Sequence, residues 1–271
     1  MVVQHNLTAI NTNRMLGLTT NAQAPSTDKL SSGYKINRAA DDAAGLSISE
    51  KMRRQVRGLT QASANAEDGI SMVQTAEGAL NEVQDMLQRM NELAVKAENG
   101  TLTTDDRNYI NAEVTQLKSE ISRVASTTTF NEKNLLNGQC STGVSLQVGA
   151  ETQQYITFSI AAMSATSLGI DDESASTATK AGLLNSAVKT ALQNVSAQRS
   201  SLGAIQNRLD HTIKNLDNVV ENTTAAESQI RDTDMATEMV RYANNNVLTQ
   251  AGQSMLAQAN QSNQGVLSLL Q

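Results

Sequence analysis

Tryptophan is absent from this sequence of 271 residues, and aromatic side chains make up only 2% of it. A compact globular domain of this length normally fills a thick core with aromatic anchors. The sequence is instead rich in Ala, Asn, Gln, Ser and Thr, a composition that suits long helical bundles with a large surface. This composition argues against a deep substrate cavity.

Cysteine and proline each occur once, as Cys140 and Pro25. A single cysteine excludes an internal disulfide and a thiolate zinc site. Because the residue before a proline avoids the α region, Pro25 predicts a break or kink of the first helical segment at Ala24. We expect a short helix to restart over residues 26–28 and to end at Gly33.

Long hydrophobic runs are also missing. No apolar stretch approaches the roughly 20 residues that a membrane-spanning helix needs, and the N-terminus lacks a basic region followed by an apolar run. The net charge is −6 and the sequence pI is near 5.0, which disfavours nucleic acid as a partner. We therefore expect no membrane and no nucleic-acid binding. The protein is expected to be cytosolic or exported without a cleavable signal.

Residues with catalytic or metal-binding potential are sparse. His5 and His211 have no Cys or carboxylate at metal-ligand spacing, and the sequence contains no His-Glu-x-x-His, phosphate-binding Gly-rich loop or Gly-x-Ser-x-Gly elbow. Asp41 and Asp42 are adjacent, but no cleft is indicated around them. Helix capping and salt bridging explain this pair better than acid/base or cation chemistry. We predict a protein that is not an enzyme and that holds no cofactor or metal.

The pattern that the sequence does contain is a heptad repeat. Small and apolar residues recur at steps of three and four over residues 45–99, which is the a/d seam of a helix that packs against other helices. Similar spacing predicts helices over residues 104–128 and 181–230, and Asn99-Gly100 supplies a left-handed stop after the first of these. The first seam consists of Leu59, Ala62, Ala66, Gly69, Val73, Ala76, Leu80, Val83, Leu87, Met90, Ala94 and Ala97.

Strand periodicity occurs in one place. Apolar residues alternate with polar ones over residues 144–148 and 156–160, with turn residues between them. This predicts one β-hairpin at about residues 142–161. Cys140 is expected to be a small, partly buried residue near the hairpin, with a reactive thiol as the alternative.

The predicted fold is mainly α: a long antiparallel helical bundle or coiled coil with one small β-hairpin and with the termini paired as a helical hairpin. We expect a discontinuous terminal domain of residues 1–44 and 231–271 and a second domain of residues 45–230. The terminal stripes are interrupted by polar residues, so burial against identical copies would stabilise them, and such heterologous contacts give open helical assemblies. The predicted polymerisation residues are Leu7, Ile10, Leu18, Leu248, Met255, Leu256, Val266, Leu267, Leu269 and Leu270.

Several long motifs connect this sequence with a known family. They are residues 29–37 (KLSSGYKIN), 40–45 (ADDAAG), 87–94 (LQRMNELA), 201–208 (SLGAIQNR), 250–252 (QAG), 256–260 (LAQAN) and 266–270 (VLSLL). In these motifs and their order, the sequence resembles bacterial flagellin in a short form that lacks the variable outer domains. It departs from the family pattern at Pro25, at Cys140 and at Gln271, where many relatives end in a basic residue.

The resemblance implies a structural subunit that polymerises with itself into the flagellar filament for swimming motility, with a core-lining terminal domain and a rod domain. It implies secretion through the flagellar type III apparatus and an extracellular location in the bacterial flagellum. The implied partners are an export chaperone, the flagellar cap and junction proteins, and host Toll-like receptor 5. The C-terminal leucines match what the chaperone and intracellular sensors read, although burial along the filament core explains them as well.

The resemblance places receptor recognition at Arg89, Leu93 and Glu113. Arg89 and Leu93 lie off the heptad seam and four residues apart, so we expect both to be exposed on one helix face. Contact with a neighbouring protofilament is the alternative role for this pair. Two other identities remain open for the protein: a hook–filament junction protein, or a monomeric coiled-coil signalling adaptor with ordered termini.

Overall fold

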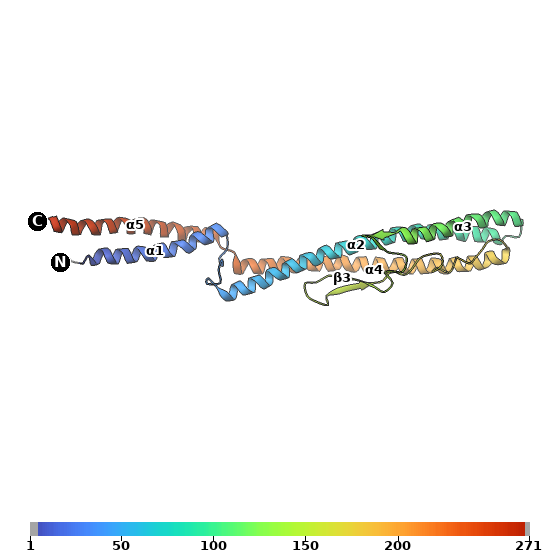
Figure 1. Cartoon of the computed structure of the whole chain (residues 1–271), viewed down its shortest axis with the longest axis horizontal. Helices are drawn as coiled ribbons and strands as arrows, with labels where there is room; N and C mark the ends of the chain where they lie inside the picture. Colours follow the sequence, from blue (N-terminus) through green and yellow to red (C-terminus); the bar gives the residue numbers. More distant parts are fainter. Residues whose placement is uncertain (1–4, 269–271) are drawn as a thin grey trace. The chain divides into compact units, whose positions relative to one another are not determined.

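A computed structural model describes residues 5–268, with the side chains of that range except those at 263, 264 and 266–268. The mainly α fold with antiparallel helices is confirmed, and Figure 1 labels its helices and strand β3. None of the described helices is long and apolar enough to cross a bilayer. The elements are α1 (Leu7–Ser32), α2 (Ala43–Glu98), α3 (Thr104–Thr127), β1 (Thr129–Phe130), β2 (Lys133–Asn134), β3 (Val144–Gln147), β4 (Tyr155–Phe158), α4 (Ala178–Arg231) and α5 (Met235–Ser268).

The chain divides into two compact units, here named the terminal unit and the middle unit. The terminal unit comprises Met1–Val56 and Glu221–Gln271, and the middle unit comprises Arg57–Val220. The division falls further inside α2 and α4 than the domain boundaries expected after residue 44 and before residue 231. Segments from both ends of the sequence thus belong to one unit.

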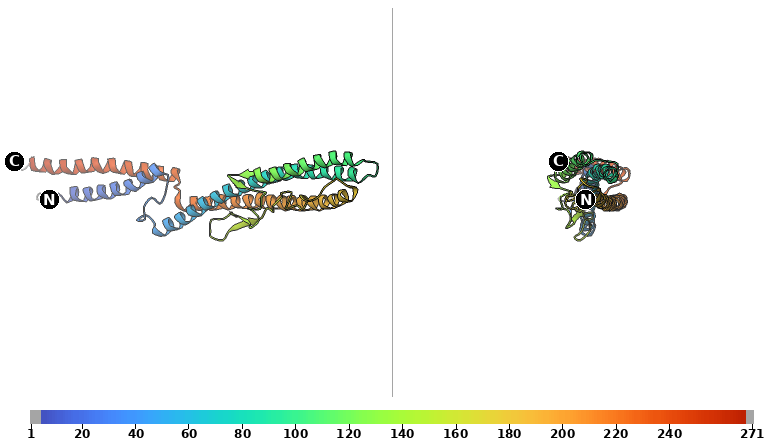
Figure 2. Two further views of the ribbon diagram at one scale, coloured as in Figure 1. Left: turned by 45° about the vertical axis from the view of Figure 1, so that its right-hand side comes forward. Right: turned by 90° about the vertical axis from the view of Figure 1, so that its right-hand side faces the viewer.

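The middle unit is built around the heptad seam of α2. Every residue of the predicted seam from Leu59 to Ala97 is buried. In Figure 1 and in the left view of Figure 2, α3 and α4 both run beside this part of α2. Ile121 from α3 and Leu184 from α4 join Leu87 in the same fully buried core. Helices in proteins draw most of their stability from tertiary packing, so the mutual burial of these stripes stabilises them.

The predicted hairpin is present as β3 and β4. The two strands pair antiparallel with Val144 opposite Phe158. Ile156 and Phe158 are buried on one face of the hairpin, whereas the residues that alternate with them in β4 are exposed, as the alternating pattern predicted. Leu146 of β3 packs on α2 at Gly69, where a Cβ atom would come within 2.2 Å of the Leu146 Cδ1 atom. The close approach of this strand to α2 therefore requires glycine at position 69.

A second hairpin corrects the expectation of a single one. β1 and β2 pair antiparallel with Thr129 opposite Asn134. The residues between them, Asn131 and Glu132, have φ angles of 47° and 64°, which is the left-handed conformation of a two-residue hairpin turn. Because this turn contains no glycine, the usual sequence signal is missing.

Cys140 follows β2 in the chain, and its Sγ donates to the carbonyl of Asn134 in that strand at 3.5 Å. Its side chain is buried rather than partly buried.

In the terminal unit, α1 and α5 lie side by side (Figure 1), so the paired termini are confirmed. The predicted break at Ala24 is wrong, because α1 is one helix from Leu7 to Ser32 with Pro25 inside it. A proline removes one helical hydrogen bond, but the turns on its N-terminal side are tied to α5. Asn245 donates to the Ala22 carbonyl at 3.4 Å, and Thr249 donates to Gln23 at 3.3 Å. The helix ends at Gly33 with φ 77°, as expected.

Candidate functional site

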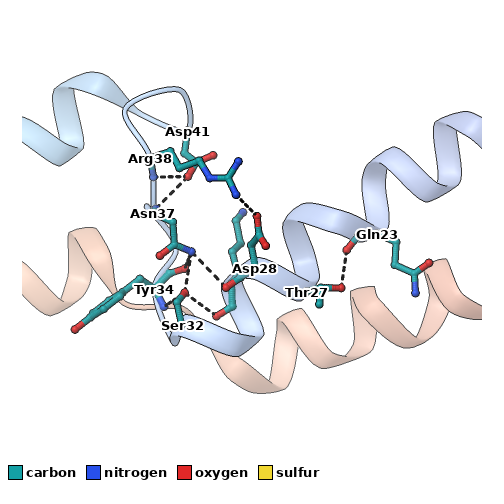
Figure 3. A network of polar contacts seen from close by, with 9 residues as sticks. Gln23, Thr27, Asp28, Ser32, Tyr34, Asn37, Arg38 and Asp41 are labelled. Carbon is teal, nitrogen blue, oxygen red and sulfur yellow. Dashed lines mark hydrogen bonds and ion pairs between the residues drawn. The ribbon is translucent and has the colours of Figure 1, made fainter.

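A polar network organises the segment between α1 and α2, within the terminal unit (Figure 3). The Asp41 carboxylate accepts hydrogen bonds from the backbone N–H groups of Arg38 at 2.9 Å and Asn37 at 3.0 Å. These N–H groups stabilise the charged form and lower the pKa of Asp41. The Arg38 guanidinium pairs with Asp28 of α1 at 3.0 Å. Asp41 thus ties the loop between the two helices rather than capping α2.

Asp42 and Arg231 complete the ties within the terminal unit. The Asp42 carboxylate accepts from the Gly45 N–H at 2.9 Å and so caps the first turn of α2. Arg231, at the end of α4, binds the Glu50 carboxylate at 2.7 Å and lies 4.7 Å from the centre of the Tyr34 ring. The sequence did not single out Arg231 or Tyr34, since their partners are distant in the chain.

The seam between α1 and α5 is made mainly of small and polar side chains. Asn6 donates to the Ala259 carbonyl at 3.1 Å, and a Cβ atom at Gly252 would lie 3.2 Å from Leu16. Ile36 is the one large hydrophobic side chain that is buried among the described residues of the terminal unit. Such a seam sets the register of two helices, but it removes little apolar surface from water.

The large apolar residues of α1 and α5 instead lie on the surface. Leu7 is 67% exposed and Met255 is 61% exposed, and Ile10, Leu18 and Leu248 are exposed to a similar degree. Large exposed apolar patches generally mark interaction sites, so this set is a candidate interaction surface. We name this set, with the exposed Met15, Met239, Val240 and Val247, the apolar terminal face.

The structure describes the remaining predicted polymerisation residues to different extents. Leu256 is half-buried. Val266 and Leu267 belong to α5, but their side chains lie outside the described part of the protein. Leu269 and Leu270 lie outside the described residues altogether. The apolar terminal face is therefore defined by residues up to Met255 only.

A groove of about 460 Å³ lies between the C-terminal part of α2 and the N-terminal part of α3 in the middle unit. It brings together the three residues to which the resemblance gave a receptor role, Arg89, Leu93 and Glu113. Sequence reasoning missed Tyr109, which lines the same groove and is 76% exposed. Its position directly before the buried Ile110 of α3 was the available signal. The other lining residues are Glu92, Lys96, Leu102, Asp106 and Ile110.

Arg89 is held in place by two carboxylates. Its Nε atom lies 2.9 Å from Glu113 of α3, and its Nη1 atom lies 3.1 Å from Glu92 on its own helix. These interactions, that with Glu113 first, raise the pKa of Arg89. All three side chains remain about half exposed, so the ion pairs orient the guanidinium more than they stabilise the fold.

The expected exposure of Leu93 is wrong. Leu93 is only 3% exposed and belongs to the core of the middle unit together with Ile110 of α3 and Leu184 of α4. The expectation assumed one apolar seam on α2. Because α2 packs against both α3 and α4, it carries a second buried stripe, and Leu93 lies on it. Leu93 therefore contributes to the floor of the groove rather than to an exposed ridge.

Lys118 is a buried cation that the sequence did not reveal. It is 8% exposed, and its ammonium group donates to the backbone carbonyls of Asp171, at 2.9 Å, and of Glu173. Burial lowers the pKa of Lys118, against the opposing charge of Asp171. These bonds fix the loop before α4 onto α3, because the carbonyls find a donor there that the loop itself does not provide.

The described residues contain no group of three or more His, Cys, Asp or Glu side chains placed to hold a metal ion. His5 and His211 are both exposed.

Comparisons with known proteins show the family of the chain. The family model described as the bacterial flagellin N-terminal helical region matches residues 3–141, and the bacterial flagellin C-terminal helical region matches residues 186–270. A flagellin of Halalkalibacterium halodurans is 52% identical, and the flagellar filament 31.3 kDa core protein of Treponema maltophilum is 47% identical. Both alignments cover 100% of this chain and 100% of the relative.

Two solved structures are similar to parts of this chain. A crystal structure of Bacillus cereus flagellin is 28% identical, with a TM-score of 0.50, over 56% of this chain and 88% of that one. A putative flagellar hook-associated protein of Vibrio parahaemolyticus, 14% identical with a TM-score of 0.58, shares the fold over 71% of this chain and 100% of its own. From the two family models and the full-length relatives, the chain belongs to the bacterial flagellin family.

Proposed function

We propose that this protein is the structural subunit of a bacterial flagellar filament and that its copies polymerise through the apolar terminal face. The observation that carries the proposal is the exposure of large apolar side chains along α1 and α5, such as Leu7 and Met255. A surface of this kind is stabilised when a neighbouring copy covers it. A contact between different patches of two copies extends into an open helical polymer when its rotation does not close.

Deletion of residues 250–271 tests this proposal, because it removes the C-terminal half of α5 and leaves the middle unit intact. We expect the truncated protein to form no filaments in negative-stain images and no sedimentable polymer. Its circular dichroism should retain the helices of the middle unit. Filaments of normal length, or loss of helix signal throughout the protein, would overturn the proposal.

The proposed route and partners follow from the family. Export takes place through the flagellar type III apparatus with an export chaperone, and the subunit then assembles in the extracellular flagellum between junction and cap proteins. The role is structural, without catalysis. The thin polar seam between α1 and α5 supports this route, because a unit with little buried apolar surface costs little to unfold for passage.

We further propose that host Toll-like receptor 5 binds the groove between α2 and α3. The groove joins a polar rim, formed by Arg89 and Glu113, to an apolar floor at Leu93. Tyr109 stands exposed at its side. Arginine and tyrosine are enriched among the residues that dominate binding energy at interfaces. The ion pairs of Arg89 hold its side chain in one orientation before binding, which reduces the entropy lost on association.

Arg89→Ala tests the groove. We expect the substitution to weaken binding to the receptor ectodomain by more than roughly 1 kcal/mol, as for a hot-spot residue. Arg123→Ala is the matched control, because Arg123 is an exposed arginine of α3 that pairs with Glu120 outside the groove. Equal affinities of the unsubstituted protein and Arg89→Ala would remove Arg89 from the site, and an equal loss in the control would show a non-specific effect of charge.

A further inference from the structure

The turn between α2 and α3 is fastened by one arginine. Arg107 of α3 donates from Nε to the Ala97 carbonyl at 2.9 Å and from Nη2 to the Asn99 carbonyl at 2.9 Å. The last carbonyls of a helix lack partners within the helix, so Arg107 satisfies the end of α2. The carbonyl that accepts the second of these hydrogen bonds belongs to the peptide unit that joins Asn99 to Gly100.

The Asn99 side chain is folded over the amides that follow it. Its Oδ1 atom accepts a hydrogen bond from the Thr101 N–H at 3.4 Å, which is an Asx-type turn. This hydrogen bond turns the side-chain amide of Asn99 toward the backbone that follows it, which includes the Gly100 nitrogen. Gly100 presents no Cβ atom to block an approach, and its N–H makes no hydrogen bond with the described part of the protein. Both residues are exposed to water.

We infer that Asn99-Gly100 is a site of intramolecular deamidation, promoted by Arg107. The Gly100 nitrogen gives up its proton to water or hydroxide and attacks the Cγ atom of Asn99, forming a new bond between carbon and nitrogen. The bond between Cγ and Nδ2 of Asn99 breaks, and this nitrogen leaves as ammonia after taking up a proton. Water then adds to one carbonyl of the resulting cyclic imide and opens it to aspartate or isoaspartate. No electrons are exchanged with another molecule.

Arg107 acts on the first step. When the Gly100 nitrogen loses its proton, the negative charge spreads onto the carbonyl oxygen of the same peptide unit, which is the oxygen of Asn99. The Arg107 guanidinium already donates to this oxygen. A charge-assisted hydrogen bond to a developing oxyanion lowers the energy of that state. The contact that fastens the turn therefore also makes its glycine amide more acidic.

The protein has an internal control with the same dipeptide, Asn137-Gly138. Asn137 also forms an Asx-type turn, since its Oδ1 atom accepts from the Gln139 N–H at 3.0 Å. No arginine or lysine side chain donates to the Asn137 carbonyl among the described residues. Gly138 has φ 98°, and its carbonyl accepts from the Ser141 N–H at 3.1 Å. The two sites share the dipeptide and the Asx-type turn, and they differ in the cation at the peptide carbonyl, in the φ angle of the glycine and in its exposure, since Gly138 is half-buried and Gly100 is exposed.

Conversion of Asn99 places one additional negative charge at the C-terminal end of α2, where the helix dipole disfavours it. The formal net charge becomes one unit more negative than −6. Lys96 and Leu102 flank this turn and also line the groove described above. The reaction thus alters the charge at one end of that groove without any enzyme.

Peptide mapping by mass spectrometry tests the inference on the full-length protein aged in neutral buffer, with isoaspartyl methyltransferase labelling to identify the isoaspartate product. We expect Asn99 to convert faster than Asn137. Arg107→Gln should slow the conversion of Asn99 about threefold to tenfold, the effect of one charge-assisted hydrogen bond on a rate, and should leave Asn137 unchanged. Arg123→Gln, the matched α3 control, should change neither site.

Gly100→Ala provides a second test, because a Cβ atom there meets nothing within 4 Å and fits the fold. We expect it to slow conversion at Asn99 only. Equal rates at Asn99 and Asn137 in the unsubstituted protein would overturn the inference. An unchanged or faster rate in Arg107→Gln, including one caused by a loosened turn, would overturn the role of Arg107.

Discussion

The terminal unit and the middle unit are both built from long helices, but they differ in where their large apolar side chains lie. In the middle unit, leucines such as Leu80 and Leu87 are fully buried among three helices. In the terminal unit, Leu7, Leu18 and Leu248 are exposed, and small or polar residues form the seam. Since both units contain leucine, the difference lies in whether the chain itself provides the partner helix. A stripe with an internal partner gives a folded core, whereas we propose that a stripe without one is a surface for another copy.

The largest effect on stability is expected from a core substitution in the middle unit. Leu87→Ala removes a fully buried side chain of α2 and leaves a cavity beside α3 and α4. We predict a loss of about 2–5 kcal/mol in the free energy of unfolding, measured by urea unfolding of the monomer followed by circular dichroism. A loss below about 1 kcal/mol would mean that this core is loosely packed and that the two units differ less than their burial indicates.

The opposite result is expected on the apolar terminal face. Leu248→Asp places a charge at an exposed position of α5, so the free energy of unfolding of the monomer should change by less than about 0.5 kcal/mol. Polymerisation should fail, because the charge would be buried unpaired against a neighbouring copy. Sedimentation of seeded protein measures this effect.

Gln250→Asp is the matched control for that variant, since it adds the same charge at an exposed polar position two residues along α5. We expect Gln250→Asp to polymerise better than Leu248→Asp. If both variants polymerise like the unsubstituted protein, the apolar terminal face is not an assembly surface.

The smallest expected effect is on the stability of the middle unit at acid pH. Asp106 forms a capping box at the start of α3, where hydrogen bonds from the Thr103 hydroxyl and N–H lower its pKa below the usual 3.8. Because the pKa of Asp106 is lower in the folded state than in the unfolded state, its contribution is present above pH 3.8 and is lost as the pH falls through the folded value. The middle unit should therefore unfold at lower urea concentrations below this pH.

Asp106→Asn should flatten the acid dependence in that range while keeping a side chain that can accept a hydrogen bond. Urea midpoints of both proteins at several pH values between about 5 and 2 measure the difference. Identical slopes would show that the Asp106 cap does not couple protonation to the fold of the middle unit.

The heptad spacing alone was enough to predict the helices and the buried seam of α2, because period and burial are linked within one helix. It did not predict the burial of Leu93, since a seam read from one helix does not show how many helices surround it. The turn at Asn131 and Glu132 also escaped prediction, because their left-handed conformation carries no glycine signal. The helix break predicted from Pro25 did not occur, because contacts with α5 hold the helix and the local sequence does not show them.

The grouping of Arg89, Leu93 and Glu113 came from the resemblance rather than from physical reasoning on the sequence, and the groove that they line was not predicted. Spacing placed Arg89 off the seam, but only the fold brings Glu113 of α3 to within 2.9 Å of it. Lys118 shows the same limit, since its partners Asp171 and Glu173 lie about fifty residues away in sequence. Contacts between distant segments depend on the packed arrangement, and no local pattern announces them.

Hydrogen exchange of backbone amides, compared between monomer and assembled filament, tests the central claim most directly. If copies of the protein supply the partners that α1 and α5 lack, amides of the terminal unit should exchange fast in the monomer and become protected in the filament. Amides of the middle unit should be protected in both states. Strong protection of α1 and α5 in the monomer, unchanged in the filament, would contradict the account.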